Sequence, residues 1–213
     1  MRPSDHPFEF GPNSPLPGTQ APKCALFIDR WGTLLEQPEK GWCARFKDAE
    51  FSPGALESLF RAHQAGWMIY LIGNEDAVAR GRITDSTWER FESELLQALS
   101  SYGIPVQRNY ACLDDPQNGK PPHDKDSVFL LPNTGAMYHA KQHDGVDLER
   151  SWVIGDSTIE LAAGWRAGCR LAAVRSGVAL ADCELDVQPE IWGSSLSQVV
   201  YELVELSEQR ARA

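Results

Sequence analysis

The chain has 213 residues, of which 42% are apolar and 23% charged, a balance typical of a globular protein with one main domain. Its formal net charge of −10 repels polyanions, so we expect neither nucleic acid nor an anionic membrane surface as a partner. Five cysteines without a CxxC pair favour a reducing compartment. No apolar run approaches the roughly 20 residues that span a bilayer, and no secretory signal is recognisable, so we predict a cytoplasmic protein. The composition says nothing about the oligomeric state.

Three segments differ in character along the chain. Residues 1–22 contain six prolines, which remove backbone donors and disfavour helix before them, so we predict an irregular N-terminal arm. Residues 23–180 carry the pattern of a folded domain. Residues 181–213 are predicted to be a C-terminal extension whose amphipathic helix packs on that domain through an apolar stripe: Leu196, Val199, Val200, Leu203 and Val204.

Strand and helix patterns alternate through the domain. Short apolar runs bounded by polar residues predict strands over residues 25–28, 68–72, 106–112, 152–154 and 170–174. Helical spacing of apolar residues covers residues 53–66, 84–102, 135–143 and 158–167. For the first two helices we expect Ser52 as N-cap and a capping box of Ser86 with Glu89. Such alternation predicts an α/β fold with a parallel sheet covered on both faces.

Polar residues stand where three of these strands end. Asp29 follows the first strand, Gly73 and Asn74 follow the second, and Asp156 follows the fourth. Because parallel sheets bind ligands at the carboxyl ends of their strands, we expect these side chains to meet at one edge.

The same three places carry the motifs of a known family. Residues 27–34, Phe-Ile-Asp-Arg-Trp-Gly-Thr-Leu, resemble the Asp-x-Asp-Gly-Thr motif of the haloacid-dehalogenase superfamily. Residues 73–81, Gly-Asn-Glu-Asp-Ala-Val-Ala-Arg-Gly, are similar to the Thr-Asn-Gln-Ser-Gly-Ile-Ala-Arg-Gly stretch of its heptose-bisphosphate and histidinol-phosphate phosphatases. Residues 155–160 resemble its Gly-Asp-x-x-x-Asp motif. Three ordered motifs are more specific than any one alone, and the chain is identified as a member over residues 24–178.

The resemblance implies a three-layer α/β/α Rossmann-like fold with a parallel central sheet and little or no cap domain. It also implies an Mg²⁺-dependent phosphatase that works through an aspartyl-phosphate. By the resemblance Asp29 is the nucleophile, and Mg²⁺ is bound by Asp29, the backbone carbonyl of Trp31 and Asp156. Glu160, one helical turn beyond Asp156, supports the metal site. Asn74 and Arg80 are the phosphate-binding candidates.

Three positions depart from the family pattern. Trp31 stands where the general acid belongs, Gly73 replaces a hydroxyl residue, and Leu131 replaces the phosphate-binding lysine. Loss of a general acid alone costs about 10²–10⁴ in rate. The conceivable substitutes are Glu75 or Asp76 as the acid and Lys120, Lys125 or Lys141 as the cation. The phosphatase subgroup that the chain resembles often carries a zinc-binding loop of Cys and His residues. Only Cys112 matches a ligand of that loop here, and one thiolate cannot make a four-ligand site, so no structural zinc is expected.

Plain structural roles remain open for the same side chains. Asp29 and Asn74 are common in turns, Asp156 suits a helix N-cap, and Arg80 suits a solvated surface. The functional hypotheses are correspondingly three. The chain is a phosphatase of small phosphorylated metabolites such as sugar phosphates, a catalytically inactive relative that binds a phosphate ligand or a protein partner, or a superfamily hydrolase of another bond type.

Overall fold

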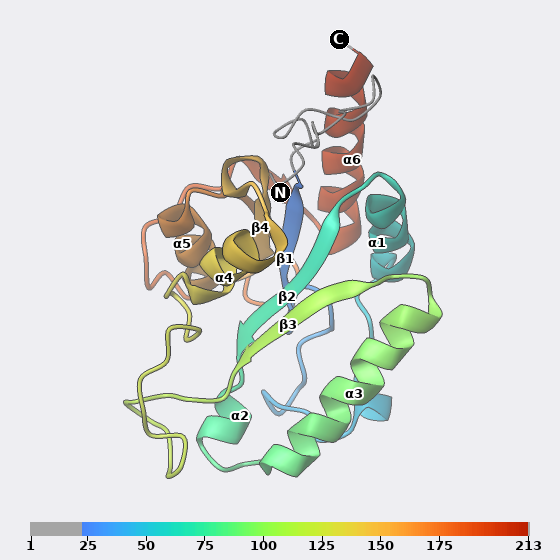
Figure 1. The fold of residues 1–213 in the computed structure, drawn as a ribbon. Helices are drawn as coiled ribbons and strands as arrows, with labels where there is room; N and C mark the ends of the chain where they lie inside the picture. The colour runs from blue at the N-terminus through green and yellow to red at the C-terminus, as the bar shows by residue number, and fades with distance from the viewer. Residues whose placement is uncertain (1–22, 213) are drawn as a thin grey trace, which may run out of the picture.

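The computed structural model describes residues 23–212 (Figure 1), so the arm expected over residues 1–22 lies outside the described residues. Its centre is one sheet of six parallel strands in the order β3-β2-β1-β4-β5-β6. The strands are β1 (Ala25–Asp29), β2 (Met68–Asn74), β3 (Val106–Cys112), β4 (Trp152–Gly155), β5 (Arg170–Val174) and β6 (Ile191–Gly193). The five predicted strands are confirmed, and β6, only three residues long, was not predicted.

Helices connect the strands, as the alternating pattern predicts. They are α1 (Ala55–Gln64), α2 (Asp76–Ala79), α3 (Asp85–Ser101), α4 (Gly135–Asp144), α5 (Thr158–Ala167) and α6 (Leu196–Arg212). The single turn α2 was not predicted. No helix in the described part of the chain is long and apolar enough to cross a membrane; the expected cytoplasmic location stays a prediction.

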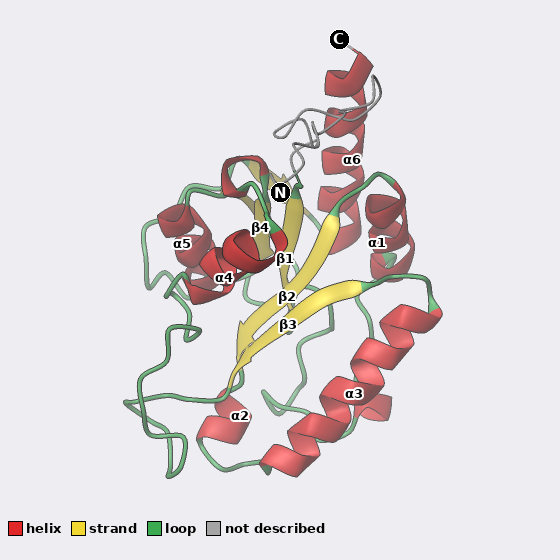
Figure 2. Cartoon of the chain, in the orientation of Figure 1, coloured by secondary structure: helices red, strands yellow, loops and turns green. Residues whose placement is uncertain are grey.

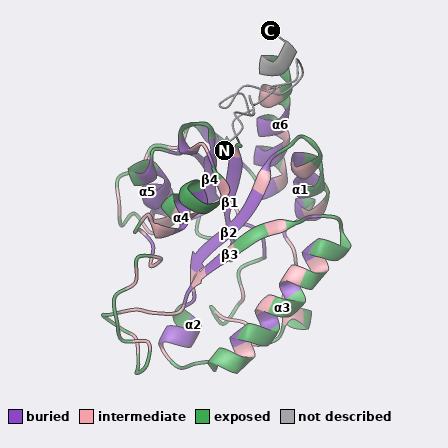
Figure 3. Cartoon of the chain, in the orientation of Figure 1, coloured by how far each residue is buried: buried purple, intermediate pink, exposed green. Residues whose placement is uncertain are grey.

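Two apolar cores, one on each face of the sheet, make three layers. Leu26 and Ile28 of β1 pack with α1, α3 and α6, whereas Ala25 and Phe27 pack with α4 and α5, as the period of two in a strand requires. Figure 2 shows α4 and α5 on one side of the sheet and α1 and α6 on the other. Strands β1, β2 and β4 are largely buried, whereas the edge strand β3 is exposed over part of its length (Figure 3). Helices on both faces of the sheet confirm the three-layer α/β/α architecture.

Both predicted helix caps are wrong. The N-cap of α1 is Gly54, in the left-handed region at φ 74°, while the Ser52 hydroxyl is buried without a hydrogen-bond partner among the described residues. Thr84, not Ser86, caps α3, since its side chain accepts from the N–H of Thr87 at 3.2 Å. Ser and Thr are near-equivalent caps, so the sequence alone could not decide between neighbouring hydroxyls.

Arg30, the residue after β1, is a charged side chain buried to 1% exposure. Its Nε donates to Glu75 Oε1 at 2.7 Å, its Nη1 to Asn109 Oδ1 at 2.7 Å, and its Nη2 to the Gly73 carbonyl at 2.9 Å. The guanidinium also lies 5.4 Å from the ring of Trp88. One side chain therefore ties β1 to β2, β3 and α3 at the carboxyl edge of the sheet.

Replacing Arg30 by Met should destabilise the protein by about 3–5 kcal/mol, because Glu75 would be left as a buried, uncompensated charge. Urea unfolding followed by circular dichroism gives the free energy of unfolding. The matched control is Arg45→Met, which removes an ion pair whose partners are 65% and 44% exposed and should cost at most about 1 kcal/mol. Equal losses in the two variants would contradict the structural role of Arg30.

Candidate functional site

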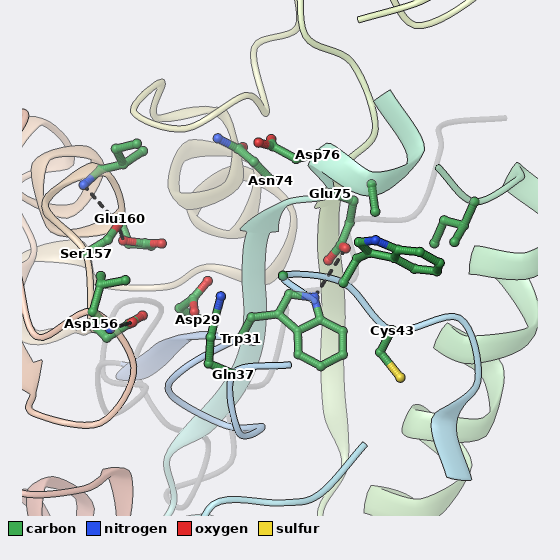
Figure 4. Close-up of a pocket in the computed structure, with 16 residues that line it drawn as sticks. Asp29, Trp31, Gln37, Cys43, Asn74, Glu75, Asp76, Asp156, Ser157 and Glu160 are labelled. Carbon is green, nitrogen blue, oxygen red and sulfur yellow. Dashed lines mark hydrogen bonds between the residues drawn. The ribbon is translucent and has the colours of Figure 1, made fainter. Parts of the chain in front are cut away.

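A cavity of about 260 Å³ opens at the carboxyl ends of β1, β2 and β4. Asp29 ends β1, Asn74 ends β2 and Asp156 follows β4, and all three line the cavity together with Glu160 of α5. Figure 4 shows Asp29 between Trp31 on one side and Asp156 with Glu160 on the other. The three polar strand ends therefore do meet at one edge of the sheet.

Three carboxylates form the acidic part of this cavity. One oxygen from each of Asp29, Asp156 and Glu160 can be chosen so that all three lie within 4.8 Å of one another. Burial raises the pKa of Asp29 well above its usual value and Glu160 adds to that rise; burial also raises the pKa of Asp156, and that of Glu160 to about 7. Clustered hard oxygen ligands suit Mg²⁺, so the donor set fits such an ion.

Asp156 is held in place from three sides. Its Oδ2 accepts the Val178 N–H at 2.7 Å and its Oδ1 accepts the Thr33 hydroxyl at 3.4 Å. Gly32, at φ +85°, packs so closely that any side chain there would overlap the Asp156 carboxylate. The N-cap of α5 is Ser157, which accepts from the N–H of Ile159, so the alternative of Asp156 as an N-cap is wrong.

Asn74 fastens the segment that carries Leu131. Its Nδ2 donates to the Leu131 carbonyl at 3.0 Å, and its Oδ1 accepts the Leu131 N–H at 2.9 Å. Leu131 is buried and precedes Pro132 through a cis peptide bond. Asn74 thus uses both amide atoms on the backbone while it lines the cavity; its phosphate-binding role stays a prediction.

The basic candidates lie away from the three carboxylates. Arg80 bonds to Asp76 at 2.8 Å and lines a neighbouring cavity that shares Asn74 and Asp76 with the first. Three other basic candidates are exposed and line neither cavity: Lys120, Lys125 and Lys141. Among the described residues, no lysine, arginine or histidine lines the cavity of Asp29. Phosphate binding by Arg80 stays a prediction.

Glu75 and Trp31 form a pair that the sequence analysis did not anticipate. The Trp31 Nε1–H donates to Glu75 Oε2 at 3.4 Å, while Glu75 Oε1 accepts from Arg30. Burial raises the pKa of Glu75, and Arg30 opposes that rise. The sequence signal that could have found this pair is that both positions depart from the family motifs. Trp31 does so in the first motif and Glu75 in the second. The metal-binding role of the Trp31 carbonyl stays a prediction.

The loop over residues 113–127 is closed by His123. Its Nε2 lies 2.9 Å from Asp85 Oδ1 and its Nδ1 lies 3.1 Å from Asp114 Oδ1, so both ring nitrogens face carboxylates. Hydrogen bonds that the protonated imidazole donates to these carboxylates, that to Asp85 first, raise the pKa of His123. Cys112 is a buried thiol that donates to the Asp114 carbonyl at 3.5 Å. The loop is thus attached to the start of α3 by side-chain contacts.

Comparison with known proteins finds one family throughout. A family model described as HAD-hydrolase-like matches residues 131–199. D-glycero-D-manno-heptose-1,7-bisphosphate 7-phosphatase of Thermosynechococcus vestitus is 29% identical over 160 residues, which are 73% of this chain and 81% of that protein. D-glycero-alpha-D-manno-heptose-1,7-bisphosphate 7-phosphatase of Burkholderia mallei is 28% identical over 145 residues, 68% of this chain and 75% of that protein.

Solved structures agree on the fold. A putative HAD-like phosphatase from Mesorhizobium loti superposes with a TM-score of 0.72 at 26% identity and covers 89% of this chain and 88% of its own. D,D-heptose 1,7-bisphosphate phosphatase from B. bronchiseptica, complexed with magnesium and phosphate, gives a TM-score of 0.73 at 24% identity. The match covers 86% of this chain and 99% of that protein's chain.

Mg²⁺ should raise the melting temperature, because an ion that binds only the folded state stabilises it by about 2.7 kcal/mol at a hundredfold excess over its Kd. In Asp156→Asn the protein should fold but lose most of this increment, since one anionic ligand is gone. Differential scanning calorimetry with and without Mg²⁺ measures both. Asp76→Asn is the matched control, because Asp76 lines the cavity outside the carboxylate cluster; an equal loss there would contradict the assignment.

The His123 contacts should make stability depend on pH. Because the folded-state pKa of His123 is raised from 6.5, its contribution is fully present below pH 6.5 and is lost as pH rises through the folded-state value. His123→Gln should therefore show a smaller fall in the urea midpoint between pH 6 and pH 8.5 than the parent, and Asp85→Asn an intermediate one. A slope unchanged in His123→Gln would rule this contribution out.

Proposed function

The chain belongs to the haloacid-dehalogenase superfamily, and on that premise we propose that it is a phosphatase of a small phosphorylated metabolite, with Asp29 as nucleophile. The observation that carries this proposal is the convergence of Asp29, Asp156 and Glu160 in one cavity at the carboxyl edge of the sheet. The heptose bisphosphates for which the relatives are named make sugar phosphates the first substrates to test.

Mg²⁺ is the proposed cofactor. Asp29 and Asp156 would hold it, with Glu160 and the Trp31 carbonyl in support, and the bound ion would neutralise charge that develops on the transferring phosphoryl group. The oxygen-only donor set and the raised pKa values of these carboxyls, which a cation would lower, support that choice.

In the proposed reaction, one Asp29 carboxylate oxygen would attack phosphorus while the bond from phosphorus to the leaving oxygen of the substrate breaks, which leaves an aspartyl-phosphate and the released alcohol or alkoxide. Water then displaces phosphate from Asp29, and the carboxylate is regenerated. Trp31, at the place of the general acid, has an indole N–H that is bonded to Glu75 and cannot protonate a leaving oxygen. We therefore propose that turnover of substrates needing an acid is lower than in a relative with one, by about 10²–10⁴.

A second candidate function is binding without turnover. The specific observation in its favour is that no basic side chain among the described residues lines the cavity of Asp29, so none of these residues replaces the missing lysine there. In this version the site would hold a phosphate ligand together with a cation, or the cavity would serve a protein partner. Because of the net charge of −10, we still predict that the chain binds neither nucleic acid nor a membrane surface.

The test is hydrolysis of a panel of sugar phosphates, including heptose 1,7-bisphosphate, with Mg²⁺. In Asp29→Asn the release of phosphate should fall by at least about a thousandfold, as removal of a nucleophile does elsewhere. Asp76→Asn is the matched control, because it removes a carboxylate from the same cavity without touching the nucleophile. Folded parent protein that releases no phosphate from any substrate, or at the same rate as Asp29→Asn, would contradict the phosphatase and favour the binding function.

A further inference from the structure

Aromatic and apolar side chains contribute to the lining of the cavity beside its polar residues. Trp31 and Trp42 line it, with Ala77 and Ile83 beside them. In Figure 4 Trp31 lies on the opposite side of Asp29 from Asp156, with the side chain of Gln37 between Asp29 and the indole, so the Trp31 ring borders the space on that side of the aspartate. Indole faces bind flat rings more strongly than their area alone predicts.

Two contacts hold the Trp31 side chain in one orientation. Its Nε1–H donates to Glu75 Oε2 at 3.4 Å, and its ring packs on Phe91 at a centroid distance of 5.3 Å. Phe91 is in turn stacked on Trp88 at 5.6 Å. A side chain held at its polar end and on its face keeps one orientation, so a ring-shaped ligand finds a preformed surface, and little side-chain entropy is lost on binding.

No other carboxyl of the cavity is free to act as a general acid. Both oxygens of Glu75 already accept N–H donors, from Arg30 and Trp31, so a proton on Glu75 would break one of these bonds. Asp76 is 56% exposed and paired with Arg80. The remaining three carboxyls are the proposed nucleophile and its cation ligands. Within the described residues, a leaving oxygen in this cavity therefore departs without a proton from the chain.

We propose that the substrate of this cavity is an aryl phosphate monoester with a single aromatic ring. The inference rests on the proposed phosphatase function and narrows its substrate to a class other than the sugar phosphates for which the relatives are named. Two independent observations carry it: a missing acid demands a leaving group that is stable as an anion, and two indoles, those of Trp31 and Trp42, line the cavity of Asp29. A cavity of about 260 Å³ is at the small end of ligand pockets, which fits one ring.

The chemistry balances without an acid. An Asp29 oxygen forms a bond to phosphorus while the bond from phosphorus to the aryl oxygen breaks, and the electron pair leaves with the phenolate, which takes its proton from solvent. Water then attacks phosphorus, the bond to Asp29 breaks, and the water proton goes to phosphate or solvent. A phenol has a pKa of about 10, whereas the pKa of an alcohol is far higher and close to that of water, so only the phenolate leaves readily unprotonated.

Three probes separate the two observations: phenyl phosphate, benzyl phosphate and cyclohexyl phosphate, each with Mg²⁺. Phenyl phosphate has both a ring and a good leaving group, benzyl phosphate has the ring with an alkoxide leaving group, and cyclohexyl phosphate has neither. The quantity to compare is kcat/KM, which reports the steps up to loss of the leaving group. We expect phenyl phosphate to exceed cyclohexyl phosphate by at least about a hundredfold, and benzyl phosphate to exceed cyclohexyl phosphate by about three- to tenfold.

Two variants test the residues. Trp31→Asp supplies an acid and should reduce the phenyl-to-cyclohexyl ratio by about a hundredfold, chiefly by raising the rate on cyclohexyl phosphate. Trp42→Leu should raise KM for phenyl and benzyl phosphate about three- to tenfold and raise KM for cyclohexyl phosphate by less, and it keeps the proposal testable if Trp31→Asp fails to fold. Trp165→Leu is the control, since this tryptophan of α5 is 71% exposed and does not line the cavity.

The outcomes distinguish the two proposals. If the parent hydrolyses cyclohexyl phosphate as well as phenyl phosphate, and does so through Asp29, the aryl substrate is wrong and the phosphatase stands. If Trp42→Leu and Trp165→Leu behave alike on all three probes, the indole lining has no role and the proposal is also overturned. If no probe is hydrolysed in a way that depends on Asp29, the aryl substrate is wrong, and the sugar phosphate panel decides separately whether the phosphatase stands.

Discussion

The buried guanidinium of Arg30 is the constraint on which the arrangement of this site depends. A charge taken out of water must be paired and hydrogen-bonded, and here the partners come from β2 and β3, with the ring of Trp88 on α3 close by. This one requirement determines which residues the adjoining positions can hold. Glu75 has to be a carboxylate that reaches inward, and Asn109 has to present its oxygen to Arg30.

The same packing accounts for two departures from the family motifs. A Cβ at position 73 would lie 2.9 Å from Arg30 Nη2 and 3.0 Å from Asp29 Oδ1, on a backbone with φ +150°, so glycine is the residue that fits there. The indole at position 31 needs an acceptor for its buried N–H, and Glu75 supplies it. Positions 31 and 75 are therefore linked by a direct contact, and position 73 is joined to them through Arg30, which donates to both Glu75 and the Gly73 carbonyl.

The strength of the local signal decided what the sequence could predict. The boundaries of α5 and β5 follow from a dense apolar pattern closed by Gly168, whereas β6 is three residues long and is recognised only by its pairing with β5. The motif positions placed Asp29, Asn74 and Asp156 at one edge, because parallel strands bring their ends together. The indole-to-Glu75 contact and the Asn74 bonds to the Leu131 backbone depend on side-chain orientation between distant segments, which no local pattern contains.

The charge of the cavity sets the order in which ligands can bind. Two unit charges 4.8 Å apart repel by about 3 kcal/mol at an effective dielectric constant of 20, and the cluster of Asp29, Asp156 and Glu160 would oppose a phosphate dianion in the same way. A lysine in the wall would relieve that repulsion directly, but Leu131 stands in its place and offers only its backbone, to Asn74. With no basic side chain lining the cavity in the described part of the chain, a bound divalent cation is what can reverse the sign of the field. Under the proposed function, cation and phosphate binding would then be strongly coupled, each raising the affinity for the other by the same factor.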